Sequence, residues 1–257
     1  MASSALSREG AIATLKIDRA EKMNALDRAT LLELREHVAD LARQPAAVVV
    51  VESAGDKVFV AGADIEAMSV MGVEEARRFS ELGHAVFDAI EALPSIVLAV
   101  VQGAALGGGC ELVLACDLVL AGEKARFGQP ETNLGLIPGF GGCARLLRRV
   151  GPMLARDLVY TGRLLSAAQA HGAGLVSRVV AQEELAGEAK ALAEQLAKRP
   201  PLALARAKAV LAAAESADAR TAARVEIEAF AGLFALEDTR EGLGAFLAKR
   251  PAVFRGR

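Results

Sequence analysis

Residues 95–111 read SIVLAVVQGAALGGGCE, and this stretch decides the fold class. Its first part, residues 95–102, is a short apolar run rich in β-branched side chains, which predicts a buried strand. Pro94 precedes the run and ends a helix predicted over residues 74–93. The glycines that follow predict a turn leading into a helix that contains Glu111. A strand that continues through a tight turn into a helix is typical of α/β proteins.

The flanking sequence repeats this alternation of strands and helices. Apolar or alternating runs predict further strands over residues 10–18, 46–51, 117–121 and 175–180. Asp27 is the predicted N-cap of a helix, Ser166 and Gln169 form a capping box, and residues 143–150 are predicted to be helical. We therefore expect an α/β core that occupies residues 1–199.

The sequence changes character after Arg199. A proline pair interrupts the chain, and no strand pattern follows it. Asp238 and Glu241 predict a capping box, and helical spacing places Phe230, Leu233 and Phe234 on one face of a helix. We expect residues 200–257 to form a helical region, which packs either on its own core or on a partner subunit.

Composition limits the kinds of function. The 257 residues are 53% hydrophobic and carry a net charge of −2, which allows a large core and gives no sign of nucleic-acid binding. Cys110, Cys116 and Cys143 show no C-x-x-C spacing, which indicates reduced thiols. The sequence shows no secretory signal and no apolar run long enough to span a membrane, so we expect a cytoplasmic protein without a membrane partner.

The segment Gly107-Gly-Gly-Cys-Glu111 is the first candidate site element. The first turn of a helix has N–H groups without intrahelical partners and the positive end of the dipole, so it can hold a developing negative oxygen. Glu111, one turn further on, can face the same place. The alternative is that the glycines only allow the strand and the helix to pack closely. A dinucleotide site is disfavoured because the G-x-G-x-x-G pattern is absent and Glu111 would repel a phosphate.

Two further segments carry candidate chemistry. Glu131 follows a proline in a glycine-rich, apolar stretch, where its protonated form is favoured, as a proton donor requires. Its alternative is a solvated loop position. In the segment VAGAD, residues 60–64, backbone N–H groups can supply a second oxyanion donor, or Asp64 can cap a helix.

The sequence lacks the residue patterns of metal sites, serine hydrolases and cysteine nucleophiles. His37, His84 and His171 are isolated, so we expect no metal site. No G-x-S-x-G motif indicates a hydrolase. Cys110 is a poor nucleophile candidate because the neighbouring carboxylate raises the pKa of its thiol.

Taken together, the motifs resemble the enoyl-CoA hydratase (crotonase) family from about residue 10 to residue 255. The segments that carry the resemblance are Asn24-Ala-Leu-Asp27, Ala61-Gly-Ala-Asp-Ile65, Ala105-Leu-Gly-Gly-Gly-Cys-Glu-Leu112, Gln129-Pro-Glu131 and Ile137-Pro-Gly-Phe-Gly-Gly142. The resemblance implies an α/β fold, the crotonase-type spiral of ββα units, with a helical C-terminal trimerisation region and trimers that stack as hexamers.

The resemblance also implies a reaction and its residues. The reaction is reversible addition of water to a 2-enoyl-CoA, giving 3-hydroxyacyl-CoA, in fatty-acid or related degradation. The N–H groups of Ala63 and Gly108 would hold the thioester oxygen. Glu111 and Glu131 would share the attacking water, and Glu131 would supply the proton to C2. No cofactor is implied, because coenzyme A is part of the substrate.

Coenzyme A and substrate contacts are implied at Lys57, Ala61, Asp64 and Ile65, with Lys57 facing the phosphates. Glu66 departs from the pattern, since related hydratases often carry a basic residue there. Residues 67–71, Phe87 and Phe140 are candidates for the floor of the acyl pocket. The rival interpretations are an enoyl-CoA isomerase, a hydratase for a branched or alicyclic substrate, and a non-catalytic or RNA-binding relative.

Overall fold

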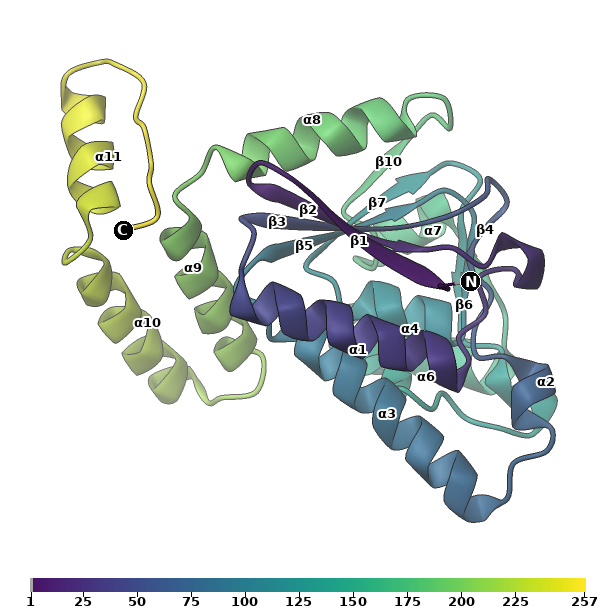
Figure 1. Cartoon of the computed structure of the whole chain (residues 1–257). Coiled ribbons are helices and arrows are strands. Elements are labelled where there is room, and N and C mark those ends of the chain that lie inside the picture. The colour runs from purple at the N-terminus through teal and green to yellow at the C-terminus, as the bar shows by residue number, and fades with distance from the viewer. Residues whose placement is uncertain (1) are drawn as a thin grey trace.

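Two sheets form the centre of the protein, which a computed structural model describes over residues 2–257 (Figure 1). The larger sheet has the strand order β1-β2-β3-β5-β7-β10 and the smaller one β4-β6-β8-β9. Neighbouring strands are parallel except in the pairs β1–β2 and β8–β9. The strands are β1 (Ser4–Glu9), β2 (Ile12–Ile17), β3 (Val48–Ser53), β4 (Val58–Val60), β5 (Ile96–Val101), β6 (Ala104–Leu106), β7 (Leu118–Gly122), β8 (Arg126–Gly128), β9 (Leu165–Ser166) and β10 (Arg178–Val180).

The chain passes from one sheet to the other in successive ββα units. Strands β3, β5 and β7 belong to the larger sheet, and each is followed by a short strand of the smaller sheet, β4, β6 or β8. Helices α3 (Val73–Glu91), α4 (Gly108–Leu114) and α5 (Gly142–Val150) complete the three units. The predicted α/β spiral of ββα units is therefore confirmed.

Helices cover both faces of the larger sheet (Figure 1). Alternate residues of each strand divide between two apolar clusters: one includes α1 (Arg28–Arg43) and α3, and the other includes α8 (Leu185–Ala197). Helix α1 begins where predicted, because the Asp27 carboxylate accepts a hydrogen bond from the Thr30 N–H at 2.8 Å. The capping box of Ser166 and Gln169 is confirmed at the start of α7 (Ala167–Gly172). Among residues 2–257, no helix is long and apolar enough to cross a membrane.

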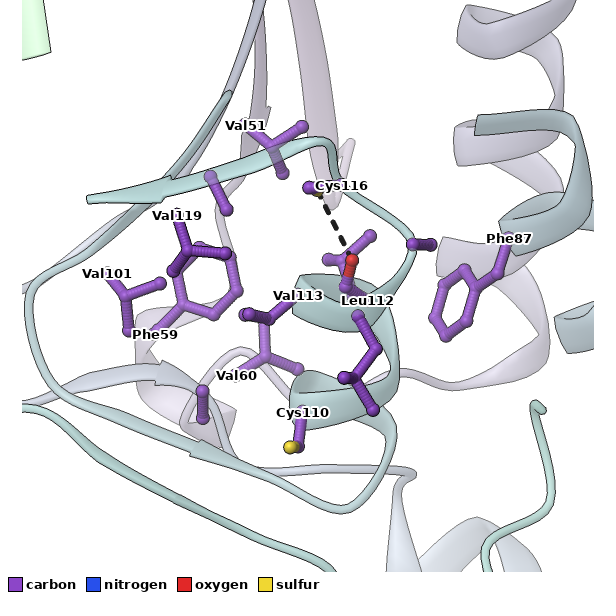
Figure 2. Packing of buried hydrophobic residues seen from close by; sticks show 14 of the residues in the cluster. Val51, Phe59, Val60, Phe87, Val101, Cys110, Leu112, Val113, Cys116 and Val119 are labelled. Atoms are coloured by element: carbon purple, nitrogen blue, oxygen red, sulfur yellow. Dashed lines mark hydrogen bonds between the residues drawn. The ribbon is translucent and has the colours of Figure 1, made fainter. Parts of the chain in front are cut away.

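Helix α4 runs through the centre of the core (Figure 2), and all of its residues are buried. Val60 of β4 and Phe87 of α3 lie beside it, and Cys116 donates a hydrogen bond to the Leu112 carbonyl at 3.3 Å. Each large apolar side chain buried here contributes about 1.5–3 kcal/mol. The helix therefore presents Glu111 from a rigid support.

The C-terminal region consists of α9 (Pro201–Ala214), α10 (Ala219–Leu233) and α11 (Glu237–Leu247). Helix α9 is attached to the core by the Lys208 ammonium, which lies 2.7 Å from the Asp117 carboxylate. Helices α10 and α11 extend away from the two sheets (Figure 1). We call α10, α11 and the residues after them the C-terminal arm. Its exposed apolar side chains are Val225, Ile227, Phe230, Phe234, Leu243, Phe246, Leu247 and Val253.

Some sequence predictions failed. Asp238 and Glu241 do not form a capping box, because Asp238 accepts hydrogen bonds from the N–H groups of Arg255 and Gly256 and Glu241 pairs with Arg250. Strands β4, β6 and β8 were not identified from the sequence, since three residues are too few to show an alternating pattern. Strand β1 and helices α6 (Pro152–Thr161) and α8 were not anticipated.

Candidate active site

Two backbone N–H groups at adjacent turns have no acceptor within residues 2–257: those of Ala63 and Gly108. Gly108 is the first residue of α4, where the helix supplies no acceptor. Around Ala63, the Gly62 carbonyl accepts from Leu26 and the Asp64 N–H donates to Leu26. These two bonds leave the N–H group of Ala63 without an acceptor among residues 2–257.

Glycines allow these two turns to touch. A Cβ at Gly62, whose φ is +120°, would lie 3.7 Å from the Gly108 nitrogen, and a Cβ at Gly108 would lie 3.3 Å from the Ala63 nitrogen. Gly107 has a φ of +50°, a left-handed conformation that favours glycine. The structure therefore brings together Ala63 and Gly108, the pair that the family resemblance implies, and their two free N–H groups lie side by side, where they can bind a negative oxygen.

Asp64 stabilises the turn that contains Ala63. Its carboxylate accepts from the Ala67 N–H at 3.1 Å and caps α2 (Ile65–Met68), and the Arg19 guanidinium lies 3.6 Å away. Asp64 therefore caps the helix, which is one of the two alternatives for the VAGAD segment, and the Ala63 N–H remains available for the other.

Glu111 is buried at the end of the first turn of α4, with about 1% of its surface exposed. One carboxylate oxygen accepts hydrogen bonds of 2.7 Å from the N–H groups of Phe140 and Gly142. Burial raises the pKa of Glu111, while the Gly142 and Phe140 N–H groups and the positive charge of Arg145 oppose the rise. Glu111 can thus act as a base, because its second carboxylate oxygen accepts no hydrogen bond from residues 2–257.

Glu131 begins the 3₁₀ helix η2 (Glu131–Leu134), which follows β8. Its carboxylate lies over the glycine turn, since a Cβ at Gly107 would be 2.8 Å from Glu131 Oε1. Burial, with a smaller contribution from the charge of Glu111, raises the pKa of Glu131 to about 7. The predicted protonated form is therefore well populated near neutral pH.

Gln129 binds the Glu131 carboxylate and was not identified from the sequence as a separate site residue. It is fully buried, and with its amide nitrogen facing Glu131 it donates to both carboxylate oxygens, at 3.0 and 3.3 Å. A Cβ at Gly142 would lie within 2.8 Å of both the Gln129 amide and the Glu111 carboxylate. The twenty-residue separation of the two glutamates in sequence is therefore closed by the fold.

Arg145 was also not identified from the sequence as a site residue. Its buried guanidinium donates to the Phe140 carbonyl at 2.9 Å and pairs with Glu91 and Asp88 of α3. It thereby holds the loop whose N–H groups bind Glu111. Its position, one turn into a helix that follows a glycine-rich loop, is the only sequence signal, and many surface arginines share it.

The cysteines are not arranged for nucleophilic chemistry. Burial raises the pKa of the Cys110 thiol, and the charges of Glu111 and Glu131 raise it further, as expected. The residue Cys143 is exposed as a whole, but partial burial raises the pKa of its thiol, and the charges of Glu111 and Glu131 also raise it. Within residues 2–257, no three His, Cys, Asp or Glu side chains are grouped to hold a metal ion.

The residues predicted to contact coenzyme A differ in their exposure. Lys57 and Ile65 are exposed, and the Ala61 N–H donates to the Met23 carbonyl. Glu66 is also exposed, and its carboxylate lies 2.8 Å from the Lys22 ammonium. The acidic residue that departs from the family pattern is thus paired with a nearby lysine.

Comparisons with known proteins agree with this geometry. The family model for enoyl-CoA hydratase/isomerase matches residues 7–257. The chain is 44% identical to a crotonyl-CoA hydratase of Syntrophomonas wolfei, over 97% of this chain and 96% of the relative. It is 40% identical to a short-chain-enoyl-CoA hydratase of Clostridium acetobutylicum, over 95% and 94% of the two chains. The crystal structure of an enoyl-CoA hydratase from Bacillus anthracis superposes with a TM-score of 0.96 at 35% identity, covering 99% of this chain and all of the other. The chain therefore belongs to the enoyl-CoA hydratase/isomerase family.

Proposed function

We propose that the protein is an enoyl-CoA hydratase, which adds water reversibly across the 2,3 double bond of a 2-enoyl-CoA to give 3-hydroxyacyl-CoA. The observation that carries the proposal is the placement of the buried carboxylate of Glu111 and the half-buried carboxylate of Glu131 beside the free N–H groups of Ala63 and Gly108. An isomerase needs one base that moves a proton between carbons, whereas hydration needs a water held between two carboxylates.

Each group has a defined task in this reaction. As the water oxygen bonds to C3, the π electrons move toward the thioester oxygen, where the N–H groups of Ala63 and Gly108 stabilise the negative charge. Glu111 accepts a proton from the water. Glu131 delivers its own proton to C2. Glu111 is then protonated and Glu131 is ionised, and transfer of one proton from Glu111 to Glu131 restores the starting state. The net result is the addition of one water, OH at C3 and H at C2.

The direct test is to mix the purified protein with crotonyl-CoA. The conjugated-enone absorbance should disappear and 3-hydroxybutyryl-CoA should form; the relatives named above for crotonyl and short-chain substrates make this the first substrate to try. Rapid conjugation of a 3-enoyl-CoA, with 2-enoyl-CoA of every length left unhydrated, would establish the isomerase instead. Absence of turnover on both substrates would favour a non-catalytic relative.

The hydration rate should depend on pH through Glu131. A proton donor with a raised pKa is active below that pKa and loses its proton above it, so kcat/KM for hydration should fall by roughly tenfold per pH unit above about 7. A pH series with crotonyl-CoA at constant ionic strength measures this. A flat rate from neutral to strongly alkaline pH would show that Glu131 is not the donor.

The phosphates of coenzyme A are proposed to lie near the exposed side chain of Lys57. Lys57→Ala should raise KM for enoyl-CoA by about two- to fivefold with little change in kcat, because an exposed ion pair is weak and remote from the reacting carbons. Lys124→Ala, at another exposed position, is the control. Identical KM values for the wild type and Lys57→Ala would contradict the assignment.

The C-terminal arm is proposed to pack on other copies of the chain, as a trimer or a dimer of trimers. Helix α10 has no buried residue, and Phe230 and Phe246 are 64% and 82% exposed. Apolar patches of this kind are typical of interfaces between subunits. A homo-oligomer covers the same patch on every copy.

This proposal predicts that Phe246→Asp shifts the protein toward monomer in sedimentation velocity at micromolar concentration. Truncation after Arg199 should abolish assembly or solubility. Arg35→Asp, at an exposed position on α1, should sediment like the wild type. A well-behaved wild-type monomer would refute the oligomer.

We further propose that no metal or cofactor takes part and that the enzyme works in the cytoplasm. The two carboxylates and two N–H donors are sufficient for the acid–base and electrophilic roles, and all three cysteines are free. Dialysis against a chelator should therefore leave the rate of crotonyl-CoA hydration unchanged.

A further inference from the structure

The turn that carries the Ala63 N–H is held by a second segment of the chain, residues 19–27, which connects β2 to α1. Leu26 and Ala63 form an isolated parallel bridge. The Leu26 N–H donates to the Gly62 carbonyl at 2.8 Å, and the Leu26 carbonyl accepts from the Asp64 N–H at 2.9 Å. In a parallel bridge, the residue between these two bonded groups directs its own N–H to the opposite side. The direction of the Ala63 donor is therefore fixed by Leu26.

The guanidinium of Arg19 joins the two sides of this bridge. Its Nη2 lies 3.0 Å from the carboxylate of Asp27 and 3.6 Å from that of Asp64, the residues that follow the two members of the bridge. Its Nη1 donates to the Ala25 carbonyl at 2.6 Å. Only 14% of the Arg19 side chain and 12% of the Asp64 side chain are exposed. An ion pair shielded in this way is screened less than one at the surface, so it can hold the two segments together.

Each of these carboxylates also caps a helix with its other oxygen. Asp27 accepts from the Thr30 N–H at 2.8 Å at the start of α1, and Asp64 accepts from the Ala67 N–H at 3.1 Å at the start of α2. Both carboxylates lie within 3.6 Å of one Arg19 nitrogen, so they are close to each other. Without the guanidinium, two like charges would remain there and would push the two sides of the bridge apart.

We infer that Arg19 is a positioning residue for the oxyanion hole. By joining Asp27 to Asp64, it keeps the Ala63 N–H directed at the place where the thioester oxygen becomes negative. This inference rests on the proposed function and adds to it a residue that acts through the turn. Oxyanion donors act over about 2.7–3.1 Å, so a small displacement of the turn weakens the transition state more than it weakens substrate binding.

The test compares Arg19→Met with the wild type. The kcat for crotonyl-CoA should fall by ~10-fold, less than the loss of a whole donor would cost, and KM should change by less than ~2-fold. Isotope-edited infrared spectroscopy of bound butyryl-CoA, a saturated thioester that cannot be hydrated, reports on the hydrogen bonds to the carbonyl. Its C=O stretch should move toward that of the free thioester, because a displaced donor polarises the carbonyl less. Calorimetric titration with butyryl-CoA should still find one site per chain.

Two further variants test the role of charge. Adding Asp64→Asn to Arg19→Met should raise kcat at least ~3-fold above that of Arg19→Met alone, because asparagine still caps α2 and the like charges are no longer opposed. Arg8→Met is the matched control. It removes an ion pair of 2.9 Å between β1 and α1, and should keep the wild-type kcat and carbonyl stretch.

The outcomes separate the inference from the function on which it rests. Failure of the wild type to hydrate any 2-enoyl-CoA contradicts the proposed function. Wild-type kcat and carbonyl stretch in Arg19→Met overturn the inference alone, and so does a double variant no faster than Arg19→Met. A fall in kcat matched by an equal loss of butyryl-CoA sites also overturns it, because the cause would be unfolding. If Arg19→Met does not fold, as judged by thermal melting, Arg19→Gln provides the same comparison with a neutral polar side chain.

Discussion

Glu111→Gln and Glu131→Gln are each expected to lower kcat for crotonyl-CoA hydration by about 10²–10⁴-fold, with little change in KM. Glutamine preserves the shape of the side chain but can neither accept the proton of the water nor donate one to C2. Both carboxylates are held in the folded protein, Glu111 by two N–H groups and Glu131 through Gln129. Lost proton transfer, rather than lost structure, should therefore dominate.

The double variant distinguishes a cooperating pair from two independent residues. If Glu111 and Glu131 act on one water, removing the second should cost much less than removing the first, so the effects should not multiply. Thermal melting of each variant controls for unfolding. Near wild-type turnover in either single variant would overturn the assignment of that glutamate.

Gly108→Pro is expected to lower kcat by about 10²–10³-fold, because it removes one N–H from the oxyanion hole. Proline is tolerated at the first position of a helix, which is where Gly108 lies, so the helix itself loses no hydrogen bond. The ring would also occupy part of the space in which the thioester oxygen binds.

Gly108→Ala is the matched control for this variant. It introduces the same Cβ, 3.3 Å from the Ala63 nitrogen, but keeps the N–H. Its loss in kcat should therefore be clearly smaller. Equal losses in the two variants would mean that steric crowding, and not the missing donor, is responsible.

Local chemistry is what the sequence predicts best. Asp27 and the Ser166–Gln169 capping box act within three residues of chain, and both cap the helices that they were expected to cap. The glycine turn and Glu111 were singled out as candidates because a strand, a glycine turn and a helix follow one another directly, whereas the choice of Ala63 and Gly108 as donors needed the family resemblance. Glu131 needed its apolar setting and the family resemblance as well.

Long-range contacts explain what was missed. Arg145 reaches Glu91 across 54 residues, and Lys22 reaches Glu66 across 44, so no local pattern indicates either pair. Long-range contacts also explain the wrong prediction at Asp238. Its local sequence predicts an N-cap, but its carboxylate accepts hydrogen bonds from the N–H groups of residues 255 and 256 instead. Gln129 stands inside a motif, but its bond to Glu131 depends on a close approach that only the fold provides.

The exposed C-terminal arm has a thermodynamic consequence for the whole chain. Ordering α10 and α11 costs conformational entropy, yet the arm buries little apolar surface to offset that cost within one molecule. In the proposed oligomer, the missing stabilisation comes from association, which follows mass action. The melting temperature should thus rise with protein concentration, and dilution alone should loosen the arm before it affects the sheets that carry the catalytic residues.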